Sequence, residues 1–146
     1  MFAIDASVWV NAYSPAEPQQ PSSLALLTAL SASGTTVIVP TLLPVELAGA
    51  IARTRGDADL GQSMAAAVAR LPFLRWAPLD EPFAQQASQL AARHRLRGAD
   101  AVYALVALLH GCDLVSLDSE HLGRLTGIVR AMTPADALAQ IAHHRP

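Results

Sequence analysis

Four acidic residues stand out because they interrupt apolar stretches of a chain in which 52% of the residues are hydrophobic and 15% are charged. They are widely separated in the sequence, at Asp5, Glu46, Asp100 and Asp118. Burying a carboxylate is costly unless it is paired or binds a metal. Two carboxylates about 4 Å apart repel each other by roughly 4 kcal/mol at an effective dielectric of 20. If the four meet, a cation is required or some of them must be protonated.

The available donor atoms indicate which cation this would be. The chain has one cysteine, Cys112, and its histidines form no pair at ligand spacing. Oxygen ligands alone favour Mg²⁺ or Mn²⁺ over Zn²⁺. A Mg²⁺ ion held by carboxylates typically acts on phosphate esters, because it lowers the pKa of a bound water, orients it for in-line attack and neutralises the charge that develops on phosphate oxygens.

The elements that must position these acids alternate along the chain. Short apolar runs with β-branched residues predict strands at residues 2–4, 37–39, 73–76, 114–117 and 128–130. Helical patterns between and after them predict helices at residues 7–13, 22–32, 42–55, 59–71, 81–94, 100–110 and 134–142. Parallel strands need crossover connections, so this alternation predicts a parallel sheet covered by helices on both faces. With no repeat and no linker, we expect one α/β domain over residues 1–146.

Such a sheet suggests how distant acids could meet. Open parallel sheets bind ligands outside the carboxyl ends of their strands, where the strand order reverses. Asp5 and Asp118 directly follow predicted strands, and Asp100 opens a predicted helix. Glu46 lies in the helix after the second strand. One cleft can therefore collect all four.

Each acid also has a purely structural interpretation. Asp5 and Asp100 could be helix N-caps, which satisfy free backbone N–H groups. Asp118 could be a turn or N-cap residue, and Glu46 could belong to a solvent-exposed stripe of its helix. Their joint occurrence near element ends of a βαβ pattern favours the site over four separate structural roles.

Four segments resemble, in order, the acidic motifs of PIN-domain nucleases: DASVWV from Asp5, PVEL from Pro44, GADAVYALVA from Gly98 and LVSLD from Leu114. In length and motif order the whole chain is similar to the VapC-type toxins of bacterial toxin–antitoxin pairs. The resemblance implies a PIN-like α/β fold whose five-stranded parallel sheet has the order 3-2-1-4-5. It also implies an endoribonuclease that depends on Mg²⁺ or Mn²⁺. The partners that it implies are an RNA substrate, a small cognate antitoxin and a second copy of the chain.

The resemblance assigns catalytic roles to all four acids. Asp5 and Asp100 match the principal metal ligands, and Asp118 matches the fourth acid, which binds metal directly or through water. Glu46 matches the acid that completes the pocket and orients the attacking water. The family expectation is a 5′-phosphate on one product and a 3′-hydroxyl on the other.

Residues beside the acids carry further expectations. Ser7 and Ser116 match small hydroxyl residues that support the acids by hydrogen bonds, and the alternative for both is local turn or cap bonding. Glu120, close to Asp118, leaves the choice of the fourth ligand open. His121 stands where relatives often have an aromatic residue, and it is more typical of a packed or surface histidine than of a ligand.

Three arginines, Arg93, Arg95 and Arg97, precede Asp100. They are candidate contacts to RNA phosphates, since backbone contacts bind RNA without strong sequence preference. The alternative is a helix end whose carbonyl groups favour cations.

The charge balance excludes several other functions. The net charge is −2, and all ten basic residues are arginine. Without lysine there is no Walker-type phosphate loop and no Schiff-base chemistry. A phosphatase with an aspartate nucleophile usually needs a lysine and a second aspartate where this chain has Ser7. The remaining alternative is a non-catalytic PIN-like module that binds RNA or protein.

No membrane partner is expected. The longest uncharged apolar run, residues 101–109, is far shorter than the roughly 20 residues that span a bilayer. The N-terminus has no basic region of the kind that opens a signal peptide. We therefore expect a cytoplasmic location.

Overall fold

The sheet has the predicted topology. A computed structural model describes residues 1–143, except for the side chains of Ser119, Glu120 and His121. Its five strands are all parallel and follow the order β3-β2-β1-β4-β5. Their bounds are β1 Phe2–Ile4, β2 Val37–Pro40, β3 Leu74–Ala77, β4 Asp113–Val115 and β5 Ala131–Met132. The strand order reverses at β1, which pairs with both β2 and β4.

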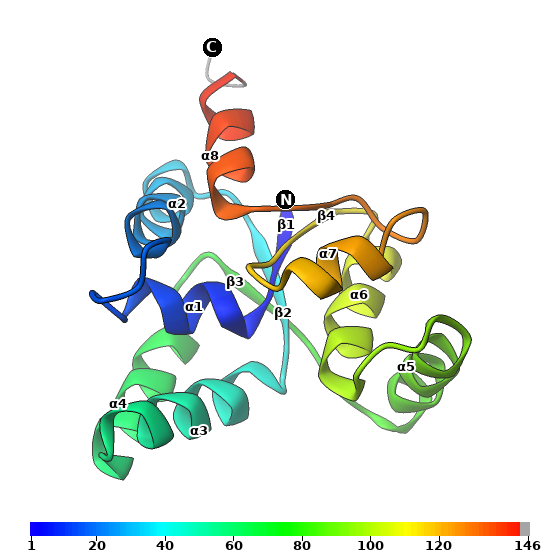
Figure 1. The fold of residues 1–146 in the computed structure, drawn as a ribbon, viewed down its shortest axis with the longest axis horizontal. Helices are drawn as coiled ribbons and strands as arrows, with labels where there is room; N and C mark the ends of the chain where they lie inside the picture. The colour runs from blue at the N-terminus through cyan, green and yellow to red at the C-terminus, as the bar shows by residue number, and fades with distance from the viewer. Residues whose placement is uncertain (144–146) are drawn as a thin grey trace.

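Helices lie on both sides of this sheet (Figure 1). Their bounds are α1 Ala6–Ala12, α2 Gln20–Ser33, α3 Leu43–Arg55, α4 Ala58–Ala69, α5 Glu81–His94, α6 Gly98–His110, α7 Ser119–Arg124 and α8 Pro134–His143. On one side α6 contacts β1, β2 and β4, and α5 packs against α6. On the other side α1 contacts α2 and α3, which in turn pack against α8 and α4. Within residues 1–143, none of these helices is both long and apolar enough to cross a bilayer.

The core explains the composition of the central elements. All residues of β1 and β2 are buried, as expected for strands covered on both faces. In α6 every residue from 101 to 107 is buried, because this helix lies between the sheet and α5. The outer helix α5 buries only Phe83 and Ala87 and is correspondingly more polar.

Local signals set the ends of several helices. Asp57 caps α4 by accepting from the Leu60 N–H at 2.8 Å, and Asp80 caps α5 by accepting from the Phe83 N–H at 2.9 Å. Gly111 ends α6 with φ +57°, a left-handed conformation that glycine adopts without steric cost. Seven of the helices correspond to predicted helices, and their observed ends differ from the predicted ends by at most two residues.

The predicted strand at residues 128–130 is wrong. Ile128 and Val129 lie in a turn, where both N–H groups donate to the Leu125 carbonyl, and β5 follows at Ala131–Met132. These β-branched side chains pack on the core from the turn, so their apolar character indicated burial rather than strand pairing.

The short helix α7 was not predicted. Strand β4 ends at Val115, so the predicted strand residues Ser116 and Leu117 belong to the loop that follows it.

Candidate functional site

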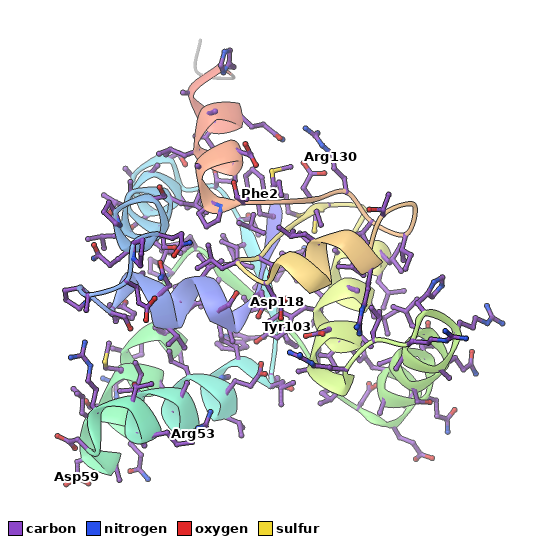
Figure 2. All side chains as sticks on the ribbon, viewed as in Figure 1. Phe2, Arg53, Asp59, Tyr103, Asp118 and Arg130 are labelled. Carbon is purple, nitrogen blue, oxygen red and sulfur yellow. The ribbon has the colours of Figure 1, made fainter. Side chains whose placement is uncertain are left out.

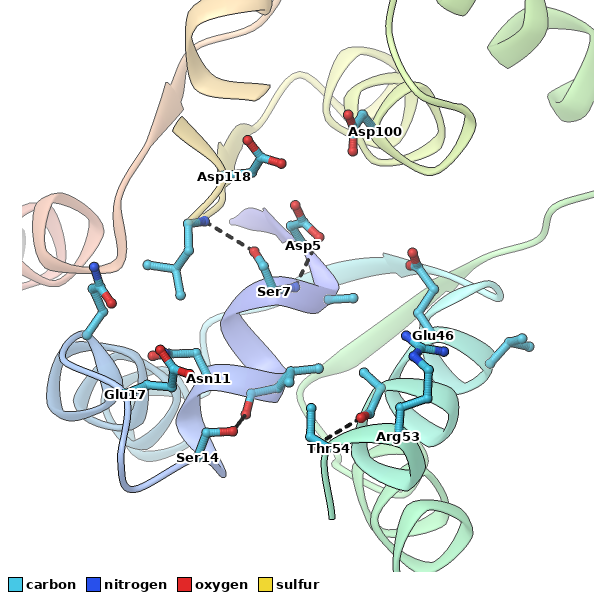
Figure 3. Close-up of a pocket in the computed structure, with 16 residues that line it drawn as sticks. Asp5, Ser7, Asn11, Ser14, Glu17, Glu46, Arg53, Thr54, Asp100 and Asp118 are labelled. Atoms are coloured by element: carbon cyan, nitrogen blue, oxygen red, sulfur yellow. Dashed lines mark hydrogen bonds between the residues drawn. The ribbon is translucent and has the colours of Figure 1, made fainter. Parts of the chain in front are cut away.

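A pocket of about 720 Å³ lies where the sheet order reverses (Figure 3). Its lining includes all four predicted acids. Asp5 follows β1, Asp118 lies three residues beyond β4, Glu46 is in the first turn of α3, and Asp100 is in the first turn of α6. The fold therefore brings together carboxylates that are up to 113 positions apart in the sequence.

Asp5 is the most buried of the acids, with 9% of its surface exposed. One carboxylate oxygen accepts from the Ser7 N–H at 3.1 Å, which makes Asp5 the N-cap of α1. The other accepts from the Ser116 hydroxyl at 2.8 Å. Capping and a place in the pocket are thus compatible, because the two oxygens point to different partners.

The two predicted supporting serines join β1 to the loop after β4. The fully buried Ser116 donates its hydroxyl proton to Asp5 and accepts from the Asp118 N–H at 3.1 Å. The hydroxyl oxygen of Ser7 accepts from the Leu117 N–H at 3.2 Å. Ser116 therefore supports an acid directly through its hydroxyl, whereas the Ser7 hydroxyl fixes the loop that carries Asp118.

Glu46 faces the same space from α3, where it is half-buried. Its carboxylate accepts from the hydroxyl of Tyr103 on α6 at 2.7 Å. Burial raises the pKa of Glu46, the Tyr103 hydrogen bond opposes this, and the nearby charges of Asp5 and Asp100 raise the pKa further. Glu46, Asp5 and Asp100 all line the same pocket, which is why the charges of the two aspartates act on Glu46.

Tyr103 is a site residue that the sequence interpretation missed. Burial and the Glu46 carboxylate raise the pKa of its hydroxyl, which therefore stays protonated and acts as a donor. Figure 2 shows Tyr103 and Asp118 in the middle of the molecule. The available signal was spacing, because Tyr103 lies one helical turn after Asp100 in an otherwise aliphatic segment.

Asp100 is not an N-cap. Helix α6 begins after Arg97, which caps it without a side-chain hydrogen bond, so Asp100 lies within the first turn. A carboxylate is favourable there because the N-terminus of a helix carries a partial positive charge. The capping alternative for Asp100 is therefore wrong, and its side chain lines the pocket.

The three predicted RNA-contacting arginines occupy different positions. Arg97 forms an ion pair with Asp118, with 3.4 Å between Nη1 and Oδ2, and its side chain is 67% exposed. Arg95 ends α5 in a left-handed conformation, φ +54°, and its carbonyl accepts from Arg124. Arg93 is exposed in the last turn of α5. None of the three lines the pocket, so Arg97 alone is connected to a predicted acid.

The remaining candidates add no described contact to the site. The side chains of Glu120 and His121 lie outside the described part of the chain. Cys112 is half-buried against the core, and burial raises the pKa of its thiol.

The donors fit a hard divalent cation in type. Every acid at the pocket offers oxygen atoms, and the like charges around Glu46 make a cation favourable there. Among the residues whose side chains are described, however, no three Asp, Glu, His or Cys side chains are close enough to hold one ion together. Shared coordination by three acids would therefore require their carboxylates to come closer together.

Comparison with known proteins identifies the fold. The family model for the PIN domain matches residues 2–127 of the chain. The chain belongs to the PIN domain family. This confirms the resemblance drawn from the four acidic motifs, and the strand order agrees with it. No curated protein sequence matches the chain.

Solved structures with this fold include toxin–antitoxin proteins. VapC20 from Mycobacterium tuberculosis, described as a sarcin-ricin loop cleaving toxin, has a TM-score of 0.70 and 18% identity over 84% of this chain and 94% of its own. FitAcB from Neisseria gonorrhoeae has a TM-score of 0.64 and 22% identity over 92% and 98%. DNA-bound VapBC from Salmonella typhimurium has a TM-score of 0.63 and 14% identity over 91% and 97%. At these identities the likeness is one of fold.

Proposed function

We propose that this PIN-domain protein is an endoribonuclease that depends on Mg²⁺ or Mn²⁺ and acts as the toxin of a toxin–antitoxin pair. The observation that carries the proposal is the pocket at the strand-order reversal, where Asp5, Glu46, Asp100 and Asp118 come together from four separate segments. An exposed fifth acid, Glu17, also lines this pocket. Membership of the PIN domain family supports the nuclease activity. The likeness in fold to VapC20, described as a toxin that cleaves the sarcin-ricin loop, supports the substrate class.

The proposed mechanism assigns different tasks to the acids. Asp5, Asp100 and Asp118 would hold the ion, which when bound supplies an activated water and offsets charge on the phosphate. Ser116 keeps one oxygen of Asp5 in place. Glu46, held by Tyr103, would orient the water and accept its proton, a task that suits a carboxyl group whose pKa is raised.

Cleavage assays with the Asp100→Asn variant test this proposal. The wild-type chain should cut single-stranded RNA with Mg²⁺ or Mn²⁺, stop when EDTA is added, and leave 5′-phosphate and 3′-hydroxyl ends. D100N should fall to the background rate, whereas D59N, at an exposed first-turn position of α4, should match the wild type. Cleavage by D100N at the wild-type rate would refute the catalytic assignment. Absence of Mn²⁺ binding by calorimetry would instead favour the binding module.

The proposed partners are a small antitoxin and a second copy of the chain. A toxin–antitoxin complex from Klebsiella pneumoniae has a similar fold, with a TM-score of 0.64 and 16% identity over 92% of this chain and 98% of its own. Apolar side chains stay exposed on two neighbouring helices, with Val45 of α3 at 67% and Leu60 of α4 at 37%. Light scattering should therefore report a dimer for the chain alone. A monomer would show that a second copy of the chain does not cover these exposed apolar side chains.

A further inference from the structure

Arg53 is the single basic residue among those that line the pocket. We infer that Arg53 binds a phosphate of the RNA strand next to the phosphate held at the acidic residues. The inference rests on the proposed ribonuclease function, and it assigns to α3 a second task beyond carrying Glu46. It concerns how the strand is held, and no bond forms or breaks at Arg53.

The position of Arg53 on its helix directs it towards the acids. It lies seven residues after Glu46, which is two turns, so both residues are on the same face of α3. Side chains on a helix lean towards its N-terminus. In Figure 3 the Arg53 side chain accordingly runs along α3 towards Glu46.

Gly49 leaves room for this arrangement. A Cβ atom at Gly49 would lie 3.1 Å from Nη1 of Arg53, which places the guanidinium directly over the glycine. Gly49 is three residues after Glu46, or about 4.5 Å along the helix axis at 1.5 Å per residue. The Arg53 guanidinium therefore lies beside a position about one turn after Glu46 on the same helix.

The guanidinium has no competing partner among the described residues. Arg53 makes no hydrogen bond or ion pair there, whereas Arg55 donates to the Tyr13 carbonyl at 3.1 Å and Arg97 pairs with Asp118. The groups that shift the pKa of Glu46 are Tyr103, Asp5 and Asp100, and Arg53 is not among them. Arg53 thus keeps its charge and its donors available, although it lines the same pocket.

RNA would need such a cation at this place. Each nucleotide brings one negative charge, and an acidic pocket repels every phosphate that is not held by an ion. The guanidinium forms two parallel hydrogen bonds with phosphate oxygens and is only weakly hydrated. Near Arg53 the lining includes the neutral Thr54, so a second phosphate can approach there.

The simpler alternative is that Arg53 only stabilises the last turn of α3, where cations are favourable. Three variants separate the two roles: R53Q removes the charge, R53K keeps it without the planar fork, and R70Q removes an exposed arginine outside the pocket. Cleavage of a labelled single-stranded RNA gives KM and kcat for each. Binding of the same RNA in a D100N background gives the salt dependence without cleavage.

We expect R53Q to raise KM about 5- to 10-fold with kcat nearly unchanged. In the binding assay the slope of log Kobs against log salt should decrease in magnitude by about 0.7, the value for one phosphate contact to a single strand. R53K should keep the slope and lose only part of the affinity. R70Q should match the wild type in both assays.

Two results would overturn the inference. If R53Q and R70Q have the same KM and salt slope while D100N still abolishes cleavage, the inference fails and the proposed function stands. The inference also fails alone if R53Q lowers the Tm more than R70Q does but leaves KM unchanged, since that is the signature of a helix-end role. If the wild-type chain neither binds nor cuts RNA, the proposed function fails, and the inference fails with it.

Discussion

The two walls of the pocket hold their acids in different ways. On the strand wall, formed by the segments after β1 and β4, Asp5 is buried and accepts from a backbone N–H and from Ser116. On the helix wall, formed by α3 and α6, Glu46 is half-buried and accepts one side-chain hydrogen bond, from Tyr103. The first acid is fixed by several donors, whereas the second has a raised pKa and a single donor.

This difference follows from what positions each wall. The pairing of Ile4 with Val115 sets β1 against β4, so the loops that follow them carry Asp5 and Ser116 side by side. The contact between Glu46 and Tyr103 joins two helices instead. In the proposed mechanism the strand wall holds the metal ligand Asp5 by hydrogen bonds, whereas the helix wall carries both the ligand Asp100 and Glu46, the acid that exchanges protons. The following variants test this contrast, from the largest expected effect to the smallest.

Asp5→Asn should reduce RNA cleavage to the background rate, because an amide cannot replace an anionic metal ligand. Asparagine caps helices as well as aspartate does, so the Tm should change little or rise as repulsion with Glu46 is relieved. The control is D57N, the same change at the N-cap of α4, which should remain fully active. A D5N protein that unfolds would show that Asp5 is mainly structural.

Ser116→Ala should lower Mn²⁺ affinity about 10- to 100-fold, as is usual when the hydrogen-bond partner of a metal ligand is removed. The reason is that one oxygen of Asp5 loses its donor. Calorimetry measures the effect, and S23A provides the control because Ser23 is also fully buried but its hydroxyl makes no hydrogen bond to a pocket acid. Equal Mn²⁺ affinities for the two variants would contradict the supporting role of Ser116.

Tyr103→Phe should lower kcat by about 10-fold or less, the effect of one lost hydrogen bond, and move the rise of activity to higher pH. The hydrogen bond from Tyr103 lowers the pKa of Glu46, so its loss lets burial and the neighbouring charges raise that pKa further. A pH profile of kcat shows the shift, with Y13F as the matched control, because Tyr13 makes no hydrogen bond to Glu46. An unchanged profile for Y103F would remove Tyr103 from the mechanism.

Glu46→Gln should give a small rise in Tm at pH 7. The folded-state pKa of Glu46 is raised, so the ionised group destabilises the fold once the pH exceeds the ordinary value of 4.5. Well below pH 4.5 the carboxyl is neutral in both states, and the gain should vanish. Thermal melts at the two pH values check this, and the exposed E81Q variant should show no such difference. A gain that persists at low pH would have another cause.

Most of the fold could be predicted from the sequence, because helix and strand patterns are local. Helix α5 was predicted with the bounds that it has, Glu81–His94, because its helical pattern lies within one continuous segment. The error at Ile128 and Val129 arose because these apolar residues lie in a turn that packs on the core. Periodicity alone cannot distinguish such a turn from a short strand. The four acids could be singled out for a similar reason, since a charge within an apolar run is visible without coordinates.

The contacts between segments needed the tertiary structure. The hydrogen bond of Tyr103 to Glu46 links residues 57 positions apart, and that of Ser116 to Asp5 links residues 111 positions apart. Neither pairing follows from residue type or from spacing within one element. The guanidinium of Arg53 over Gly49 depends on side-chain direction and was likewise missed.

The amino-acid sequence by itself determined the alternation of strands and helices and the residues able to hold a cation, because hydrophobic periodicity and isolated charges are properties of short segments. Only the tertiary structure decided which donor each carboxylate meets, which acid has a raised pKa and which arginine enters the pocket. Those outcomes depend on distances between segments far apart in the chain, and these distances are set by sheet register and helix packing.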